Sequence, residues 1–295
     1  MTLPHVLIIG HGYVGSQLAL QLDEAGFPVS AVNRTAESGL PYPVLQGDVS
    51  SPESIRLVAA ELKNSATRCI VHCASSGHGG AAAYRSVFLD GLKNLHEVFP
   101  GVPVLFTSSS SVYGQIDGSI VDENSETAPD RETSRLLCEA ENLTRHAGGI
   151  ALRLAGIYGP GRSVHVKKML EGTATIEEGA VSRYLNQIHR HDAVGAIRHL
   201  ISSGAATFRG RLFNVVDDTP LTQRECYEGL ATLFQLPLPP EAPAVLDRKR
   251  AWTNKIVSNA ALRATGWKPV YPSFLDAVRF DTTLVPSIRA AVDAP

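Results

Sequence analysis

Apolar residues in the first half of the chain fall into short continuous runs, separated by stretches with a helical period. Residues 6–9 are four consecutive apolar residues, which is typical of a parallel strand buried on both faces. Over residues 14–25 the apolar positions recur at steps of three and four, which predicts a helix, and residues 28–32 form a second strand. The same alternation predicts further strands at 44–49, 69–74, 103–107 and 150–154, and further helices at 51–63, 82–98 and 132–146.

The regular alternation of strand and helix loosens after about residue 157. We expect a helix to begin within residues 184–194 and to run to about Ser202, and residues 212–216 to form a last strand that returns to the main sheet. The sequence therefore predicts one domain over residues 1–156, rejoined by 190–216, and a mainly separate, smaller lobe over 157–295.

The turn between the first strand and the first helix carries three glycines, in the sequence GHGYVG at 10–15. Gly10 suits a tight turn, Gly12 lets a pyrophosphate approach the backbone, and Gly15 lets the helix pack closely on the strand. The free N–H groups at the start of the helix then face the phosphates. In this strand–turn–helix–strand context we interpret the motif as a dinucleotide site in a Rossmann-type, doubly wound α/β sheet, with a purely structural glycine turn as the alternative.

The end of the second strand selects the cofactor. NAD(H) requires an acidic residue there to hold the ribose 2′-hydroxyl, whereas a 2′-phosphate requires a cation. The chain has Asn33 and Arg34 at this place, and no carboxylate follows directly, so we predict NADP(H) over NAD(H). A solvated surface arginine is the alternative for Arg34. Asp48 could reach the adenine or serve only as a turn residue, and the remaining predicted cofactor contacts are Tyr13, Val14, Val49, Ala74 and Ser75.

Composition excludes several classes of function. The 27 basic residues nearly balance the 29 acidic ones, so we expect neither nucleic acid nor an anionic membrane surface as a partner. The four cysteines lack a metal-binding spacing and suit a reduced, cytoplasmic protein. We find no signal-peptide pattern and no apolar run long enough to span a bilayer.

Several short motifs lie along nearly the whole chain in one order. They are GHGYVG at 10–15, GD at 47–48, SSSSVYG at 108–114, LRLAGIYGPGR at 152–162, NQIHRHDAV at 186–194, FNVVDD at 213–218 and GWKPVYP at 266–272. This set resembles the extended short-chain dehydrogenase/reductase family, which includes nucleotide-sugar epimerases and dehydratases. The resemblance implies an NAD(P)-binding domain, a small-molecule substrate held by a capping lobe, and a possible homodimer formed through the helices that follow strands four and five.

The active-site positions depart from the family pattern. The family uses a serine or threonine after strand five and a Tyr-x-x-x-Lys pair on the next helix, in which the lysine lowers the pKa of the tyrosine. Ser109 matches the serine, but Arg131 stands at the tyrosine position and Arg135 at the lysine position. An arginine cannot exchange a proton in the working range of pH. The chain therefore resembles the atypical branch of the family that lacks the tyrosine.

A missing general acid leaves three interpretations open. In the first, the proton comes from water or from another side chain, the candidates being Tyr113, Tyr158, His189 and His78. In the second, Ser109 and Arg131 only polarise the substrate oxygen during hydride transfer. In the third, the protein is a non-catalytic NADP(H) sensor. We favour an oxidoreductase acting on a small carbonyl or alcohol, with a nucleotide-sugar epimerase as the alternative enzyme.

Overall fold

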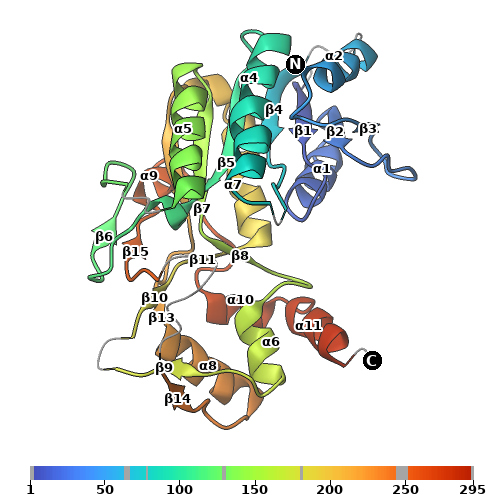
Figure 1. The fold of residues 1–295 in the computed structure, drawn as a ribbon. Coiled ribbons are helices and arrows are strands. Elements are labelled where there is room, and N and C mark those ends of the chain that lie inside the picture. Colours follow the sequence, from blue (N-terminus) through green and yellow to red (C-terminus); the bar gives the residue numbers. More distant parts are fainter. Residues whose placement is uncertain are drawn as a thin grey trace. The chain divides into compact units, whose positions relative to one another are not determined.

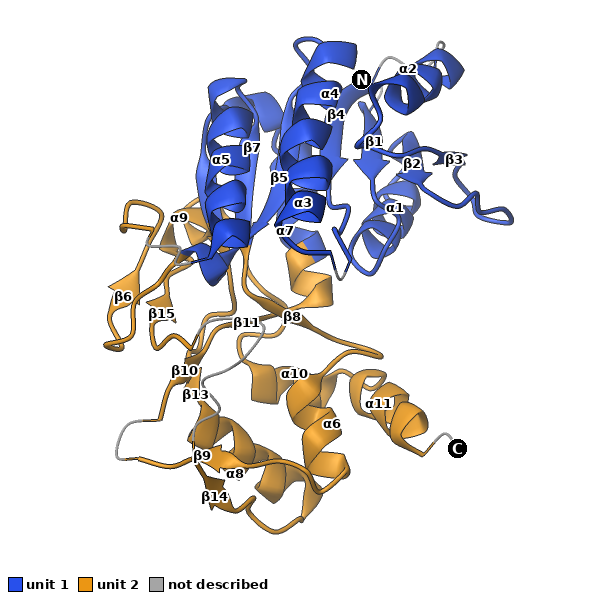
Figure 2. Cartoon of the chain, in the orientation of Figure 1, with its two compact units in different colours: residues 1–112, 129–153, 194–213 blue, residues 113–128, 154–193, 214–295 orange. Residues whose placement is uncertain are grey.

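The computed structural model describes residues 3–62, 67–77, 79–127, 131–179, 182–243 and 252–293. Within it the chain divides into two compact units, coloured separately in Figure 2. Unit 1 comprises residues 1–112, 129–153 and 194–213, and unit 2 comprises residues 113–128, 154–193 and 214–295. The second unit thus takes its residues from three stretches of the chain.

Unit 1 is built on a seven-stranded parallel sheet in the order β12-β7-β5-β4-β1-β2-β3 (Figure 1). This is the predicted doubly wound Rossmann-type sheet. β1 lies inside the sheet, between β2 and β4, because β2 and β3 are added on one side of it and the later strands on the other. The strands are β1 (His5–Ile9), β2 (Val29–Asn33), β3 (Val44–Gln46), β4 (Thr67–His72), β5 (Val104–Ser109), β7 (Ile150–Leu154) and β12 (Leu212–Val215).

The helices of unit 1 lie where the sequence predicted helices, apart from an interruption within residues 82–98. The side chain of Ser51 caps α2 and Pro52 occupies its first turn, as expected for a residue without a backbone donor. Helix α4 packs against α2 and against α5, and α7 lies behind the sheet in Figure 1. The bounds are α1 (Gly15–Glu24), α2 (Pro52–Glu61), α3 (Ala81–Tyr84), α4 (Gly91–Val98), α5 (Glu132–His146) and α7 (Arg190–Ser202).

The helix predicted over 82–98 is interrupted by a π-helical segment, Arg85–Asp90, between α3 and α4. A buried histidine of β4 lies beneath this segment, and the His72 Nε2 atom is 2.9 Å from the carbonyl oxygen of Val87. Burial lowers the pKa of His72 to about 4, so the ring is neutral and donates to this carbonyl. The wider helical turn thus has a specific polar partner inside the fold.

Unit 2 consists of helices and four two-stranded sheets. Its core contains Tyr158, Met169, Tyr227 and Phe274 among the buried side chains. The elements are β6 (Ile120–Val121), β8 (Gly156–Tyr158), α6 (Val164–Leu170), β9 (Ile176–Glu177), β10 (Tyr184–Leu185), β11 (Gln187–His189), β13 (Leu221–Thr222), α8 (Gln223–Phe234), β14 (Glu241–Ala242), β15 (Ile256–Val257), α9 (Ala260–Arg263), α10 (Phe274–Phe280) and α11 (Leu284–Val292).

The helix expected to begin within residues 184–194 does begin there, but not at the start of that stretch. Residues 184–189 form β10 and β11, and helix α7 begins only at Arg190. β10 pairs with β13 and β11 pairs with β8, so partners distant in sequence determine the conformation of this stretch. Local periodicity cannot reveal such partners.

Candidate cofactor and active site

The turn after β1 in unit 1 contains three glycines, of which the fold requires two and does not require the third. Gly10 has a φ of +100°, and a Cβ atom there would lie 2.4 Å from the Cα atom of Ala74. A Cβ atom on Gly15 would lie 1.9 Å from the carbonyl oxygen of Gly10. By contrast, a Cβ atom on Gly12 would have no neighbour within 4 Å. The chain itself leaves space over Gly12, which fits the predicted approach of a pyrophosphate.

The start of α1 presents backbone donors to the same turn. Its N-cap residue is Val14, whose side chain has no hydrogen-bond acceptor, and the helix begins at Gly15. The hydroxyl and the N–H group of Ser16 both bond the carbonyl oxygen of Gly12, at 2.7 and 2.9 Å. Val14 thus leaves the start of α1 without a side-chain cap, which suits a helix N-terminus that meets a phosphate, and the residues present fit a dinucleotide.

A carboxylate stands at the end of β2, contrary to the expectation from the sequence. The amide of Asn33 donates to Glu37 Oε1 at 2.8 Å, and His11 Nδ1 is 2.9 Å from the same oxygen. His11 Nε2 in turn lies 3.0 Å from the Tyr42 hydroxyl. These hydrogen bonds, chiefly that to His11, lower the pKa of the Glu37 carboxyl. Glu37 escaped the sequence analysis because it is four residues beyond Asn33, and only the folded loop brings it back.

Arg34 and the other predicted cofactor residues occupy varied surroundings. Arg34 is exposed, and its carbonyl accepts a hydrogen bond from Gln46. The Asp48 carboxylate accepts bonds from the N–H and hydroxyl groups of Ser50, so it serves at least as a turn residue. Tyr13 and Ala74 are half-buried, Val49 is buried, and Ser75 is exposed.

The end of β5 carries two serines with different surroundings. Ser108 is buried and donates to the Glu141 carboxylate at 2.5 Å. The Arg153 guanidinium bonds the same carboxylate, with Nη2 2.7 Å from Oε2. The next residue, Ser109, is half-buried, and its hydroxyl oxygen accepts a bond from the N–H group of Ser111 at 3.2 Å. The buried network joins β5, α5 and β7 and so fixes the strand end that carries Ser109.

Arg131 and Arg135 lie one turn apart at the start of α5. Arg131 is the N-cap residue and is half-buried, whereas Arg135 is exposed. Arg131 precedes the helix with an extended backbone and Arg135 lies in its first turns, so both side chains belong to the same end of α5. Since Glu141 anchors this helix to β5 through Ser108, the structure places both arginines and Ser109 on connected elements of unit 1.

Three of the alternative proton donors, Tyr113, Tyr158 and His189, lie in unit 2 and are buried. The Tyr113 hydroxyl is 2.7 Å from the carbonyl oxygen of Asp122 and 2.9 Å from Asn214 Oδ1. Tyr158 is also buried, and burial raises its pKa well above the usual value. His189 Nε2 is 3.1 Å from Asp281 Oδ2, yet burial lowers the pKa of His189 to about 4. These surroundings suit structural roles for all three side chains, and His78 lies outside the described residues.

A parallel sheet of this strand order, with a glycine turn at the β1–β4 switch point, defines a dinucleotide-binding Rossmann protein. More specifically, the chain belongs to the NAD dependent epimerase/dehydratase family, which matches residues 6–215. The confirmed family is the one that the sequence motifs resemble.

Individual relatives are distant, and some of them match over most of the chain. Protein YeeZ of Escherichia coli K12 is 28% identical over 283 residues, which cover 90% of this chain and 96% of that protein. The 3-diazoavenalumate denitrifying reductase of a Streptomyces sp is 28% identical over 50% of this chain and 52% of its own length. The structure of Thermus thermophilus UDP-glucose 4-epimerase in complex with NAD has a TM-score of 0.77 at 20% identity, and the match covers 98% of this chain and 100% of that one. Because the two sequences are only 20% identical, this similarity concerns the fold alone.

No helix among the described residues is long and apolar enough to cross a membrane. Likewise, no group of three or more histidine, cysteine or acidic side chains in the described part of the chain could hold a metal ion.

Proposed function

We propose that the protein is an NADP(H)-dependent oxidoreductase that transfers a hydride to or from a small carbonyl or alcohol substrate. The observation that carries this proposal is the arrangement in unit 1, where one rigid sheet holds the glycine turn and the end of β5 with Ser109. The buried Ser108–Glu141–Arg153 network joins to that sheet the helix that carries Arg131 and Arg135.

The substitution of tyrosine by arginine changes the chemistry that α5 can supply. A bound nicotinamide supplies or accepts the hydride. The Arg131 guanidinium keeps its charge and can stabilise negative charge on the substrate oxygen, together with the Ser109 hydroxyl. We assign the proton to solvent, because a guanidinium does not release one in the working range of pH. Arg135 then provides a positive charge where the family lysine contacts the nicotinamide ribose.

Two side chains at the end of β2 support different cofactors. Arg34 is exposed and immediately follows β2, where its guanidinium could pair with a 2′-phosphate through two hydrogen bonds. Glu37 favours NAD(H), because a carboxylate can accept bonds from ribose hydroxyls. Its Oε1 atom already accepts from Asn33 and contacts His11, and for this reason we assign NADP(H) first and NAD(H) as the alternative.

The first test is a fluorescence titration with NADPH and NADH of the unsubstituted protein, Arg34→Ala and Glu37→Gln. Arg198→Ala, an exposed arginine of α7, is the matched control. We expect NADPH to bind more tightly, and Arg34→Ala to weaken NADPH at least tenfold, equal to about 1.4 kcal/mol, without weakening NADH. Tighter NADH binding that Glu37→Gln weakens would instead assign NAD(H).

Catalysis is tested on the same preparations by following NADPH oxidation with a panel of aldehydes and ketones. Arg131→Ala should reduce kcat by about 100-fold or more if the guanidinium stabilises an oxyanion, while Arg198→Ala should leave it unchanged. Tight NADPH binding without oxidation by any carbonyl would support the sensor and contradict the oxidoreductase. Interconversion of nucleotide sugars without net NADPH consumption would support the epimerase.

A further inference from the structure

The second unit contains a cavity that has no role in the function proposed above. It has a volume of about 200 Å³ and lies between β6, the end of β10, the segment 216–220 and the segment 256–259. Its apolar lining consists of Ile120, Leu185, Val216, Pro220, Ile256 and Val257. Ile120 is 70% exposed, so one wall of the cavity lies at the protein surface, which gives a small molecule access from solvent.

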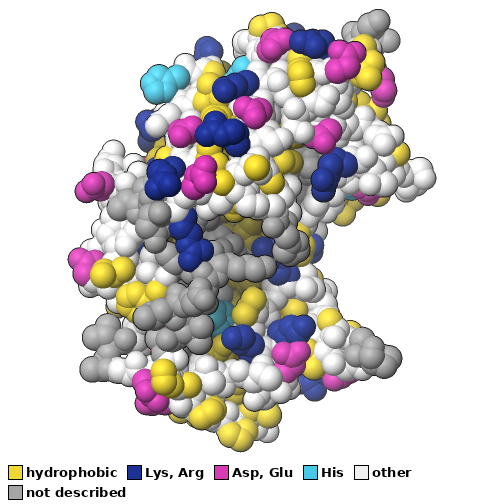
Figure 3. Space-filling model, in the orientation of Figure 1, with side chains coloured by type: hydrophobic (Ala, Val, Ile, Leu, Met, Phe, Trp, Pro, Cys, Tyr) yellow, Lys and Arg dark blue, Asp and Glu magenta, His cyan; other side chains and the backbone are white. Residues whose placement is uncertain are grey.

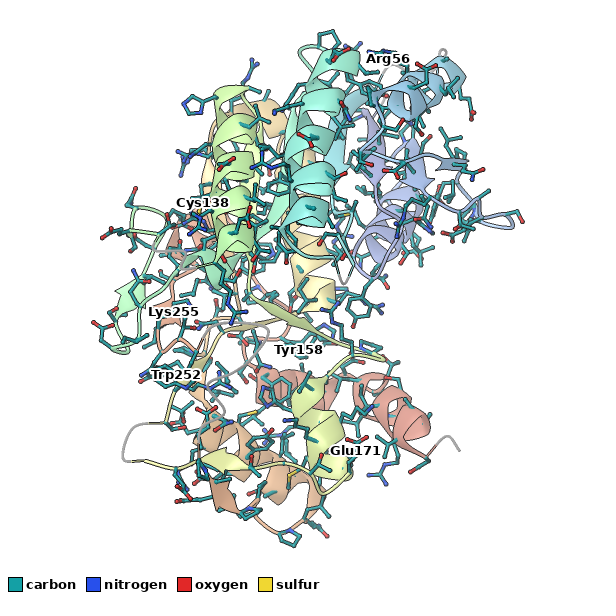
Figure 4. The ribbon with its side chains drawn as sticks, viewed as in Figure 1. Arg56, Cys138, Tyr158, Glu171, Trp252 and Lys255 are labelled. Carbon is teal, nitrogen blue, oxygen red and sulfur yellow. The ribbon has the colours of Figure 1, made fainter. Side chains whose placement is uncertain are left out.

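Two amide side chains of the lining hold the walls of this cavity together. The Asn186 amide donates to the carbonyl oxygen of Lys255, which is labelled in Figure 4, at 2.9 Å. The same amide accepts a bond from the N–H group of Val257 at 2.7 Å. The Asn259 amide donates to Asp218 Oδ1 at 2.8 Å. Both amides are thus engaged within the chain itself.

Asp217 belongs to the same lining and is only 6% exposed. Its N–H group donates to the carbonyl oxygen of Gln187 at 2.9 Å, and its carbonyl oxygen accepts from the Asn259 amide at 3.3 Å, so its backbone is fixed. Among the residues that the structure describes, none donates a hydrogen bond to the Asp217 carboxylate or forms an ion pair with it. The fold therefore holds this carboxylate in place without bonding it.

The carboxylates of the lining offer acceptors to a ligand. Asp218 Oδ1 accepts from Asn259 and lies 3.4 Å from Arg263 Nε, but a carboxylate has about four acceptor positions on its two oxygens. Asp218 therefore retains acceptor capacity beside Asp217. The complementary ligand is a group with several N–H donors.

A buried carboxylate that makes no hydrogen bond is unfavourable at a purely structural position. Taking its charge out of water costs free energy, and asparagine has nearly the same shape without the charge. Burial, followed by the charges of Asp218, Asp192 and Asp276, raises the pKa of Asp217 well above its usual value. A positive group bound beside Asp217 would relieve both effects.

We propose that this cavity binds a small alkylamine, whose ammonium group donates hydrogen bonds to Asp217. An ammonium carries three donors and no acceptor, which matches the carboxylates of the lining. The alkyl chain then lies against the apolar lining, whereas two carboxylates disfavour an anion. The inference goes beyond the proposed oxidoreductase function and does not depend on it, because every lining residue belongs to unit 2.

The size of the cavity limits the ligand. Sites for drug-sized molecules have volumes of about 300–1,000 Å³, so a cavity of about 200 Å³ suits a short alkylamine or the amino end of a longer molecule. We therefore choose n-butylammonium as the probe. Its neutral and anionic counterparts of similar length are 1-butanol and butyrate.

The test is isothermal titration calorimetry of the full-length protein, without NADPH, with each of the three probes at pH 8 and constant ionic strength. At this pH an alkylamine is protonated, since its pKa is about 10.4. The variant Asp217→Asn removes the charge and keeps the shape. The matched control is Asp293→Asn, an exposed aspartate at the end of α11 in the same unit.

We expect saturable binding of n-butylammonium to the unsubstituted protein and to Asp293→Asn, with at least tenfold weaker binding to Asp217→Asn. The unsubstituted protein should bind 1-butanol at least tenfold more weakly than n-butylammonium, and butyrate more weakly still. The absence of saturable n-butylammonium binding, equal binding by Asp217→Asn, or a preference for 1-butanol or butyrate would overturn the assignment. Because no cofactor is present, the result is independent of whether the protein oxidises NADPH.

A second pair of variants tests the position of the site at the protein surface. Ile120 and Ile116 are 70% and 63% exposed, so arginine at either position should leave the fold intact, but of the two only Ile120 lines the cavity. Ile120→Arg brings a positive charge to the cavity and should weaken n-butylammonium binding at least tenfold, whereas Ile116→Arg should not. Equal affinities of these two variants would contradict the proposal.

Thermal unfolding without ligand distinguishes a ligand site from a structural carboxylate. If Asp217 is held for a ligand, Asp217→Asn should unfold at a temperature at least as high as that of Asp293→Asn, since the variant no longer buries a charge. A lower unfolding temperature for Asp217→Asn would show that the chain itself uses the carboxylate, and it would overturn the proposal.

Discussion

Gly12 and Gly15 lie three residues apart, yet they are glycine for different reasons. Gly15 is required by the fold, because a side chain there would overlap the carbonyl oxygen of Gly10. A side chain on Gly12 would meet open space in the chain itself. The fold does not require glycine at position 12, and we propose that a ligand approaching the backbone does, as the dinucleotide motif predicts.

Alanine at each position should separate folding from binding. Gly12→Ala should unfold at nearly the same temperature as the unsubstituted protein but bind NADPH at least tenfold more weakly. Gly15→Ala should be destabilised by about 1–3 kcal/mol or more, since a Cβ atom 1.9 Å from an oxygen forces the helix to move. Denaturant unfolding and fluorescence titration measure the two effects. Unchanged NADPH affinity of Gly12→Ala would contradict the proposed position of the pyrophosphate.

Among the elements, α5 depends on a buried ion pair for its position on the sheet. Glu141 is 2% exposed and Arg153 is 5% exposed, and the carboxylate also accepts the bond from Ser108. Good geometry and several hydrogen bonds offset the loss of water around both charges. The pair joins α5 to β7, and the bond from Ser108 joins the same helix to β5, the strand that carries Ser109.

Replacing one residue of the Glu141–Arg153 pair should lower the stability of the protein more than replacing both residues. Glu141→Ala should lower the free energy of unfolding by about 3–5 kcal/mol, because it leaves the Arg153 charge buried without its carboxylate. The double variant Glu141→Leu/Arg153→Met should recover much of that loss, since apolar side chains of similar size then fill the space. Urea unfolding of both variants measures the difference. A double variant that is less stable than Glu141→Ala would show that the pair is not coupled as described.

At the scale of the whole molecule, both units contain a buried histidine whose pKa lies well below its ordinary value. Burial lowers the pKa of His72 in unit 1 and of His189 in unit 2 to about 4, although Asp281 opposes the shift of His189. Below their ordinary value of 6.5 the unfolded chain binds protons that the folded protein does not. Both units should therefore lose stability as the pH falls from about 6.5 to about 4.

The variant His72→Gln tests this acid sensitivity while retaining an N–H donor for the carbonyl of Val87. For His72 the shift corresponds to about 3 kcal/mol, present above pH 6.5 and lost as the pH falls to 4. We expect the free energy of unfolding of His72→Gln to depend less steeply on pH in this range than that of the exposed-histidine control His146→Gln. Parallel pH profiles of the two variants would contradict the assignment.

The family resemblance suggests a homodimer, and this remains a prediction. The helices expected to form the interface are α4 and α5. In Figure 3 the face over these helices carries lysine, arginine, aspartate and glutamate side chains among scattered hydrophobic ones. An interface there would combine apolar and charged contacts.

The sequence by itself determined the parallel sheet, the glycine turn and the family. Apolar runs, helical periods and the spacing of Gly10, Gly12 and Gly15 are local patterns, and the backbone follows them wherever tertiary contacts agree with them. Ser109, Arg131 and Arg135 could be placed because each lies at a fixed distance from such a local motif. The absence of the family tyrosine was evident from the same pattern.

Only the tertiary structure decided which side chains surround these positions. Glu37 meets His11 across 26 residues, Ser108 meets Glu141 across 33, and residues 184–189 form strands because their partners lie elsewhere in the chain. Charges and hydrogen bonds act through space, so their effect on a site depends on contacts that no local period along the sequence records.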